Sequence, residues 1–309
     1  MADIAEPRRY EVIVDGGYFF DLLFTGLPRI PALGTELFAK DFALFPGWAY
    51  RTALAFRRLE IPVGWAVDFG TDLFSRYVMD EAARNGIDDS LFRVHERPVR
   101  RVSAAMVRSG NHAFASFMDD LDVASVGPLL EIHRPAWILL GGFENGERFW
   151  DIIAHARRAG TRVFMDCQGV ERTIADADVA RAIGAVDVIA ANEHEARQLA
   201  GETRLGAIVA TLSSLGPTVV LKRGRRGSMA IEGGRLWRAP ALPVVVESTV
   251  GAGDSFSAGF LYALIRGGSV GDGLRFGNVV GGLASAAPDG SLFPGPQRLE
   301  ELAKTLDLK

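Results

Sequence analysis

Short apolar runs alternate along the chain with segments whose apolar residues recur every three or four positions. The apolar runs predict buried strands at residues 12–14, 61–67, 137–140, 162–165, 186–190 and 219–222. The helical spacing predicts helices at 49–59, 72–85, 149–156, 193–200, 255–265 and 273–286. Strands that alternate with helices are typical of a mainly parallel sheet covered on both faces. We therefore predict an α/β fold with three α/β/α layers, formed as one domain over residues 1–309.

Two segments break this alternation, at about 16–45 and 92–118. In the second, apolar runs at 102–107 and 113–117 flank Ser109-Gly110-Asn111, which is a hairpin pattern. We predict that the two segments form a small antiparallel β lid over one end of the main sheet. Because an unpaired strand edge seeks a partner, we also expect a homodimer through this lid.

Composition narrows the classes of function. The 309 residues are 48 % apolar and carry a net charge of −4, with acidic and basic residues mixed. No basic tract indicates nucleic acid or a membrane surface as a partner, and no apolar run is long enough to span a membrane. The single cysteine, Cys167, permits no intrachain disulfide, and the start of the chain lacks the apolar core of a signal peptide. We expect a cytoplasmic protein.

A glycine-rich turn carries the first chemical signal. Gly251, Ala252 and Gly253, here called the glycine turn, lead into an apolar helical stretch and are followed by Asp254. Their backbone N–H groups and the positive end of the helix would attract an anion. A carboxylate beside an anion site suits a base that takes a proton from a hydroxyl attacking the anion. An ordinary helix N-terminus with an acid in its first turn explains the residues equally well.

Other phosphate and metal signatures are missing from the sequence. The chain has no Gly-Lys dipeptide, so no Walker motif is present, and Phe256 stands where a Rossmann pattern needs its third glycine. No cluster of Cys and His residues has the spacing of metal ligands.

The segment 248–260, Ser-Thr-Val-Gly-Ala-Gly-Asp-Ser-Phe-Ser-Ala-Gly-Phe, resembles the second conserved pattern of the PfkB, or ribokinase-like, carbohydrate-kinase family. The resemblance implies a ribokinase-like fold, ATP as phosphoryl donor and Mg²⁺ as cofactor. It implies that the glycine turn is an anion hole and that Asp254 is the base for the acceptor hydroxyl. Because of this resemblance, we favour an anion hole with a base over an ordinary helix N-terminus as the interpretation of these residues.

Three further segments match the nucleotide half of that family. Asn192-Glu193-His194-Glu195 reads as a capping box, and it is also similar to the family's Asn-x-x-Glu, which implies Asn192 near the nucleotide and Glu195 near Mg²⁺. The stretch 221–227 resembles the strand and turn that border the nucleotide. Asn278 falls where the family lines its adenine pocket. The implied cofactor-binding residues are Asn192, Lys222, Gly224, Gly227 and Asn278.

The N-terminal half matches less closely. Gly16 to Asp21 resembles the opening strand whose aspartate binds sugar hydroxyls, a task that suits a carboxylate because it accepts from two adjacent O–H groups. Gly47 is kept from the family's first pattern, but Arg51 stands where asparagine is usual. Arg51 is either a surface arginine or the partner of a carboxylate or phosphate on the substrate. Phe114 either stacks on the substrate or belongs to the lid core.

Two departures concern polar contacts and ions. Asp166-Cys167-Gln168 stands where the family often has Asp-x-Asn. Ser248 stands where an aspartate often precedes the threonine in a loop that helps bind a monovalent cation, so potassium dependence stays open.

We therefore predict an ATP-dependent sugar kinase that phosphorylates a hydroxyl of a small, sugar-like carbohydrate, with an acidic or phosphorylated sugar as the hypothesis that Arg51 raises. One alternative is a nucleoside kinase of the adenosine type, with a base slot formed by phenylalanines near Phe19, Phe20, Phe114 and Phe117. The other is a non-catalytic protein that senses sugars or nucleotides. The retained Asp254 and Glu195 argue against the latter.

Overall fold

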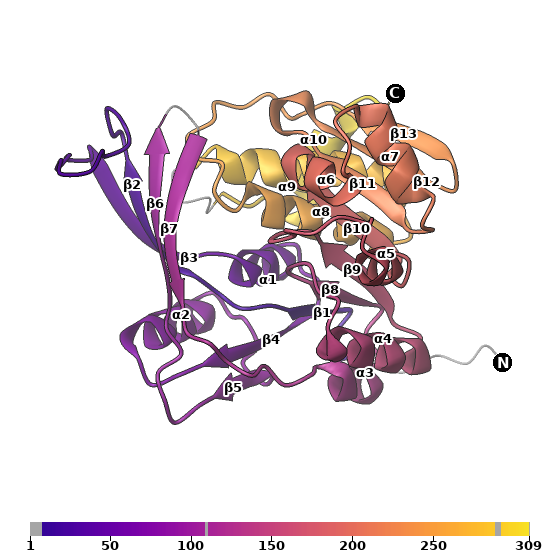
Figure 1. Ribbon diagram of the computed structural model, residues 1–309, viewed down its shortest axis with the longest axis horizontal. Helices are drawn as coiled ribbons and strands as arrows, with labels where there is room; N and C mark the ends of the chain where they lie inside the picture. The colour runs from indigo at the N-terminus through magenta and orange to yellow at the C-terminus, as the bar shows by residue number, and fades with distance from the viewer. Residues whose placement is uncertain (1–7, 109–110, 288–291, 309) are drawn as a thin grey trace.

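The computed structural model describes residues 8–108, 111–287 and 292–308. Within these residues, a nine-stranded sheet forms the middle layer of the molecule (Figure 1). All pairings from β11 to β5 are parallel, and the hairpin of β12 and β13 adds two antiparallel pairings at one edge. The strands lie in the order β13 (Arg235–Ala239), β12 (Ser228–Glu232), β11 (Thr218–Lys222), β10 (Val188–Asn192), β9 (Arg162–Asp166), β8 (Trp137–Leu140), β1 (Val12–Asp15), β4 (Val63–Phe69) and β5 (Phe92–Val94).

Helices cover both faces of this sheet, as the alternating pattern predicts. Each helical layer packs its apolar side on the sheet and encloses one of two buried clusters of apolar residues. One layer contains α1 (Ala49–Arg58), α2 (Leu73–Arg84), α8 (Ala252–Ile265), α9 (Val270–Ser285) and α10 (Pro296–Lys304). The other contains α3 (Gly127–His133), α4 (Glu147–Ala159), α5 (Ala177–Ile183), α6 (Glu193–Ala200) and α7 (Leu205–Ser213). The three-layer prediction is confirmed.

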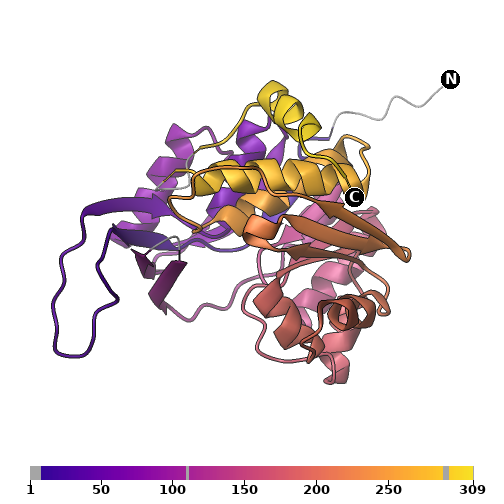
Figure 2. The ribbon, with the colours of Figure 1, turned by 90° about the horizontal axis from the view of Figure 1, so that it is seen from above.

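A second, four-stranded sheet stands at one end of the molecule and forms the lid (Figure 1). Its strands lie in the order β3 (Asp41–Pro46), β2 (Phe20–Thr25), β6 (Arg101–Arg108) and β7 (Asn111–Met118). The predicted hairpin of the second segment is present as β6 and β7, and residues 109–110 of its turn lie outside the described residues. The loop between β2 and β3 extends away from the body of the molecule (Figure 2).

The structure corrects two details of the lid. Its central pairing, between β2 and β6, is parallel, because the chain makes a long excursion through β3, α1 and β4 before it returns as β6. The predicted lid segment 92–118 also begins too early. Strand β5 pairs with β4 at the edge of the main sheet, because Phe92 packs there against Trp65 and Phe69.

The start of α8 differs from the prediction in a way that matters for the site. The helix begins at Ala252, three residues before the predicted start at 255, with Gly251 as its N-cap in the left-handed conformation (φ 72°). Glycine adopts this conformation without a side-chain clash. Asp254 therefore lies in the first turn of the helix.

Candidate active site

One large cleft, of about 1610 Å³, contains all the residues predicted for catalysis, for nucleotide and metal binding and for the sugar. It lies where the lid, the carboxyl ends of the strands and the start of α8 meet. Carboxyl ends of parallel strands are the usual place for a ligand in such a fold. The predicted residues that line it are Asp21, Gly47, Arg51, Phe114, Asn192, Glu195, Lys222, Gly224, Gly227, Gly251, Ala252, Gly253, Asp254 and Asn278.

Asp254 lies in the floor of this cleft. Burial and the nearby Asp166 carboxylate raise its pKa to about 6, although Lys222, Gln168 and Arg51 act in the opposite direction. The side-chain amide of Gln168 donates to Asp254 Oδ1 at 2.6 Å. This hydrogen bond fixes one carboxylate oxygen and leaves Oδ2 for another donor. Sequence reasoning noted Gln168 only as a departure from a pattern and did not place it beside Asp254.

A buried ion pair adjoins Asp254. Lys222 Nζ donates to both carboxylate oxygens of Asp166, at 2.9 and 2.8 Å, and Ser257 Oγ donates to Asp166 Oδ2 at 2.9 Å. Burial alone would lower the pKa of Lys222, but the carboxylates of Asp166, Glu195 and Asp254 raise it above its ordinary value. Lys222 is therefore an ammonium ion in the floor of the cleft.

A row of residues across the lid faces the cleft on the other side. Phe45, Asp21, Ser103 and Ser116 are register partners on four neighbouring strands, and the Ser103 and Ser116 hydroxyls lie 2.8 Å apart. Burial raises the pKa of Asp21 to about 7, against the opposing effect of Arg51. The two serines went unnoticed in the sequence because their alternation with apolar residues becomes meaningful only once the strand register is known.

Strand alternation also sorts the four phenylalanines of the predicted base slot. Phe19 and Phe114 line the cleft. Phe20 is buried on the opposite side of its strand, where its ring contacts Phe74. Phe117 is 50 % exposed and lies near Arg100, outside the cleft. Of these four rings, only Phe19 and Phe114 can therefore contribute to a base slot in the cleft, since neighbouring residues of a strand point to opposite faces.

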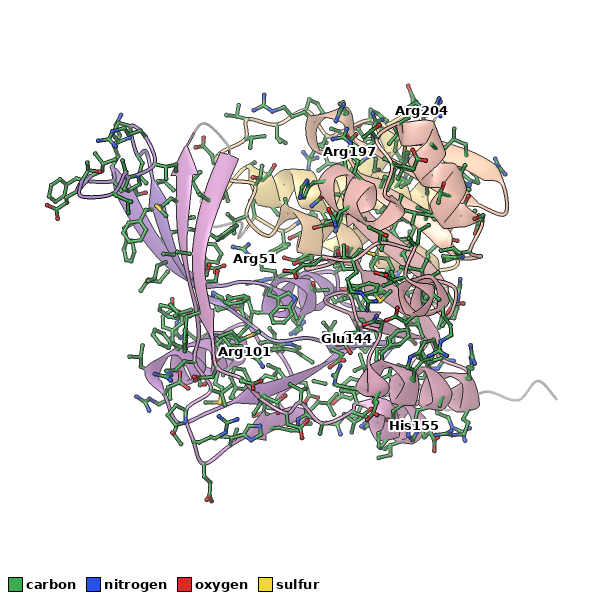
Figure 3. All side chains as sticks on the ribbon, in the orientation of Figure 1. Arg51, Arg101, Glu144, His155, Arg197 and Arg204 are labelled. Atoms are coloured by element: carbon green, nitrogen blue, oxygen red, sulfur yellow. The ribbon has the colours of Figure 1, made fainter. Side chains whose placement is uncertain are left out.

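Arg51 is not a surface residue, although it stands on an amphipathic helix. It is 3 % exposed, and its guanidinium lies 4.0 Å from the centre of the Phe45 ring. A Cβ at Gly251 would overlap Arg51 Cδ, so the arginine side chain runs directly over the glycine turn. Figure 3 shows Arg51 between the lid and the layer of α8 and α9. The arginine thus joins the lid side of the cleft to the glycine turn.

The entry to α1 is shaped by close contacts. A Cβ at Gly47 would overlap Asp21 Oδ2, so only glycine leaves room for this carboxylate. Trp48 follows with φ at 57°, an uncommon value for a residue other than glycine, and its indole Nε1 donates to Gly141 O at 2.7 Å. Trp48 lines the cleft. Apart from its place between Gly47 and the helix, nothing in the sequence indicated a role for this aromatic residue.

Asn192 and Glu195 form the predicted capping box at the start of α6. Asn192 Oδ1 accepts from the N–H groups of His194 and Glu195, both at 2.9 Å, and Glu195 Oε2 accepts from Asn192 N at 2.7 Å. Burial raises the pKa of Glu195. The Glu195 carboxylate is partly buried and lies on the wall of the cleft.

The described residues contain no group of three or more His, Cys, Asp and Glu side chains able to hold a metal by themselves. Mg²⁺ commonly uses one or two carboxylates and completes its shell with water and substrate phosphates. Glu195 fits this donor set as a single protein carboxylate. Any divalent cation here would depend on a bound polyphosphate for its remaining ligands.

The wall beyond β11 combines glycines with an apolar loop. Gly227 has φ at 78°, and a Cβ there would overlap Ala239 O, so the backbone requires glycine. Asn278 is 8 % exposed and donates to Pro240 O at 2.8 Å. The loop that Asn278 holds contributes apolar lining that the sequence had not indicated, namely Leu242, Pro243, Val244 and Val246.

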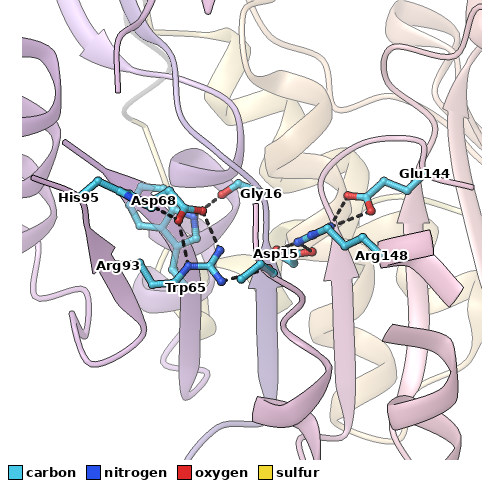
Figure 4. A network of polar contacts seen from close by, with 9 residues as sticks. Asp15, Gly16, Trp65, Asp68, Arg93, His95, Glu144 and Arg148 are labelled. Atoms are coloured by element: carbon cyan, nitrogen blue, oxygen red, sulfur yellow. Dashed lines mark hydrogen bonds and ion pairs between the residues drawn. The ribbon is translucent and has the colours of Figure 1, made fainter. Parts of the chain in front are cut away.

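Two clusters of charged residues, one around Asp15 and one around Asp68, hold the ends of β1 and β4 (Figure 4). Asp15, at the end of β1, accepts from Arg148 at 2.7 Å, and Arg148 also donates to Glu144 at 2.7 Å. Asp68, in β4, accepts from Arg93 at 2.7 Å and contacts His95 at 2.7 Å. These partners account for the buried carboxylates, so we assign them to the scaffold.

The part of the chain that the structure describes has no helix long and apolar enough to cross a membrane.

Ser248 is fully buried, and its hydroxyl accepts from Val250 N at 3.2 Å in the loop before the glycine turn.

Comparison with known proteins extends over most of the chain. The family described as "pfkB family carbohydrate kinase" matches residues 47–292. A ribokinase of Lactococcus lactis is 25 % identical, with 97 % of this chain and 98 % of the relative covered. A 1-phosphofructokinase of Haloferax volcanii is 29 % identical over 70 % of this chain and 73 % of its own length. The solved structure of Arabidopsis thaliana ribokinase with ribose and ATP superposes with a TM-score of 0.79 at 23 % identity, covering 96 % of this chain and 99 % of that one.

Proposed function

The chain belongs to the pfkB family of carbohydrate kinases, and on this premise we propose that it transfers the γ-phosphoryl group of ATP to a hydroxyl group of a small sugar that carries a carboxylate or a phosphate. Its enzyme class is that of phosphotransferases with an alcohol group as acceptor. The observation that carries the proposal is the partly buried carboxylate of Asp254 in the first turn of α8, directly after the glycine turn.

Asp254 is the general base in this proposal. Its Oδ2 takes the proton of the acceptor hydroxyl while the new oxygen–phosphorus bond forms and the bond to the leaving ADP breaks. A pKa of about 6 leaves the group ionised at neutral pH and still basic enough to accept a proton. The hydrogen bond from Gln168 holds the carboxylate in one orientation.

The glycine turn binds the charge of the transferring group. The first N–H groups of a helix have no partner inside the helix, and together with the helix dipole they favour an anion. Transfer of a phosphoryl group depends mainly on positioning and on electrostatic stabilisation of its oxygens. Gly253 contributes its N–H without a side chain that would keep the phosphoryl group away.

The nucleotide occupies the half of the cleft beyond β11. Gly224 and Gly227 allow close approach of its phosphates, and the apolar loop that Asn278 holds packs on its base. Glu195, close to Asn192, is the protein carboxylate nearest to the phosphates. Bound there, Mg²⁺ would neutralise phosphate charge and orient the γ-phosphoryl group.

The acceptor occupies the half below the lid. Asp21 accepts hydrogen bonds from adjacent sugar hydroxyls, Phe114 packs on the ring, and Arg51 pairs with an anionic substituent. The 1-phosphofructokinase relative, whose name gives a sugar phosphate as its substrate, supports an anionic acceptor. Closure of the lid would exclude water, which competes with the sugar as phosphoryl acceptor.

Replacing the base tests the proposed chemistry. Asp254→Asn is expected to lose roughly 10²- to 10⁴-fold in kcat. It should still bind ATP, because the glycine turn and the nucleotide wall remain. ADP release, measured with a coupled assay, gives kcat, and isothermal titration gives ATP affinity. A kcat of the variant within threefold of the wild type would contradict the role of Asp254 as general base.

The anionic acceptor is tested at Arg51. Arg51→Asn restores the residue that the family commonly has and should raise the KM of an acidic or phosphorylated acceptor by at least tenfold, since a charged bidentate partner is lost. The KM of the neutral sugar of the same skeleton should change little. An unchanged KM for the charged acceptor would contradict the proposal that Arg51 binds its anionic group.

A nucleoside kinase is the second candidate, and one observation favours it. Phe19 and Phe114 both line the acceptor half of the cleft and offer aromatic faces to a base. A screen of ADP release over sugars, sugar acids, sugar phosphates and nucleosides decides between the two. Turnover with a nucleoside and none with any sugar would replace the sugar-kinase proposal, and ADP release with any acceptor excludes a non-catalytic sensor.

A further inference from the structure

Lys222 is a largely buried cation that the chemistry proposed above does not use. It ends β11, its side chain is 11 % exposed, and it donates to both oxygens of Asp166 at 2.9 and 2.8 Å. Asp166 is itself 2 % exposed and is held a second time by the hydroxyl of Ser257, a residue of α8. The ammonium is therefore fixed in the floor of the cleft from two elements.

The same ammonium lies beside the glycine turn. A Cβ at Gly253 would lie 3.5 Å from Lys222 Nζ, which places the cation at contact distance from that residue. An ammonium group has three hydrogens to donate. Asp166 takes two of them, and no other side chain or carbonyl among the described residues accepts the third. One N–H thus remains for a group that is bound at the glycine turn.

We propose that Lys222 is a catalytic residue that contacts the phosphoryl group during its transfer, and that Asp166 is the positioning residue that holds it there. The proposal rests on the proposed function and assigns Lys222 a place at the reacting phosphorus instead of the outer wall of the nucleotide site. During transfer, charge spreads over the three equatorial oxygens of the phosphoryl group. Backbone N–H groups at the glycine turn supply partial charges, and Lys222 adds a full one. Lys222 keeps its proton throughout, because the acceptor proton passes to Asp254.

A different role for Lys222 predicts different behaviour. The lysine could serve only to neutralise Asp166, so that Asp254 does not face an unpaired carboxylate. Removal of Lys222 alone changes both the phosphoryl contact and the charge next to the base. Removal of Lys222 and Asp166 together keeps the charge balance and deletes only the phosphoryl contact. The double variant therefore separates the two roles.

The experiment compares Lys222→Met, Lys222→Met with Asp166→Asn, and Lys304→Met as the control, since Lys304 is exposed on α10. With the acceptor found in the ADP-release screen, we expect both Lys222 variants to lose roughly 100- to 1,000-fold in kcat, as enzymes do when one transition-state donor is removed. The acceptor KM should stay within threefold. The single variant should also shift the acid limb of its pH–rate profile upward, and the double variant should not. Lys304→Met should match the wild type.

Two results would overturn the inference. One is a double variant with kcat within threefold of the wild type, which leaves Lys222 as a neutralising partner only. The other is a double variant whose loss lies in the acceptor KM instead of in kcat. If the single variant fails to fold because Asp166 is left unpaired, the double variant alone decides, since it buries no isolated charge. A wild type that releases no ADP with any acceptor would instead contradict the proposed function, so the two failures are distinct.

Discussion

At the scale of single residues, two carboxyl groups of the cleft, those of Asp254 and Asp21, have pKa values raised close to neutral pH. Burial raises the pKa of Asp254 to about 6 and that of Asp21 to about 7. The Asp166 carboxylate adds to the shift at Asp254, and the Asp254 carboxylate adds to the shift at Asp21. The cations Arg51 and Lys222 limit the shift at Asp254. Both carboxylates act in the ionised form in our proposal, one as a base and the other as an acceptor of sugar hydroxyls.

The pH dependence of the reaction follows from these two groups. Below pH 7 Asp21 becomes protonated, and below pH 6 Asp254 does, so kcat/KM should fall as the pH drops from 7 to 5. In Asp21→Asn only the step near pH 6 should remain. Initial rates between pH 5 and pH 9 measure both profiles. A profile of the wild type that stays flat down to pH 5 would contradict the assignment of Asp254.

Asp254 should also cost stability in its ionised form. Its folded pKa of about 6 lies above the ordinary value of 3.8, so folding favours the protonated group. Above pH 6 the ionised group therefore destabilises the fold by about 3 kcal/mol, and this cost disappears as the pH falls below 3.8. Asp254→Asn should unfold at a higher temperature than the wild type at pH 8, and the difference should shrink at pH 4.5. A variant that is less stable at pH 8 would contradict this.

At the scale of elements, the close packing of α8 on α9 sets the position of the base. Glycines make this approach possible: a Cβ at Gly259 would lie 2.8 Å from Phe276 O and 2.8 Å from Val280 Cγ2, and a Cβ at Gly273 would lie 2.8 Å from the Phe260 ring. Because α8 carries Asp254 in its first turn, any change in the spacing of the two helices moves the carboxylate.

This packing predicts opposite effects for two substitutions of the same kind. Gly259→Ala should destabilise the protein by roughly 1–3 kcal/mol, since the backbone carbonyl of Phe276 cannot move without a shift of α9. Gly206→Ala in α7 is the matched control, because a Cβ there meets nothing within 4 Å. It should stabilise by up to about 1 kcal/mol through helix propensity. Urea unfolding measures both, and equal effects would contradict the role of close packing.

At the scale of the whole molecule, the two apolar clusters lie on opposite faces of one sheet, which supports the proposal of a single domain. The lid is the exception, since it stands apart with only a small cluster of its own. Apart from Phe114 in the cleft, its large exposed apolar side chains lie on the outer strands and on the loop between β2 and β3; they are Ile30, Leu33, Phe38, Phe42, Leu44, Phe117 and Met118. Large exposed apolar residues that gather in one region mark an interaction surface.

We propose that this surface pairs with the lid of a second copy of the chain. Sedimentation velocity at micromolar concentration should therefore show a dimer. Phe42→Glu should shift the protein to a monomer, because the side chain is 49 % exposed on the edge strand β3 and a charge there opposes an apolar contact. Leu73→Glu on α2, 57 % exposed and outside the lid sheet, is the control and should leave the dimer intact. A wild type that sediments as a monomer would contradict the proposal.

Features that depend on residues close together in the chain could be predicted from the sequence alone. Alternation of apolar runs with helical spacing gave the three layers. Three local features each depend on residues only a few positions apart: the glycine turn with Asp254, the capping box of Asn192 and Glu195, and the hairpin of β6 and β7. Turn and cap chemistry is local, because each donor and its acceptor lie at most four residues apart.

Contacts between residues far apart in the chain could be seen only in the folded structure. It decided that Arg51 is buried over Gly251, that Gln168 holds Asp254, and that Lys222 and Asp166 pair. It also decided that β2 and β6 pair in parallel and that β5 joins the main sheet. The periodicity of apolar residues indicates that a segment is a strand and which of its sides is apolar. Which strand it pairs with depends on packing between segments far apart in the sequence. For the same reason, the position of Arg51 over the glycine turn, on which our proposal of an anionic acceptor depends, could not be predicted from the sequence.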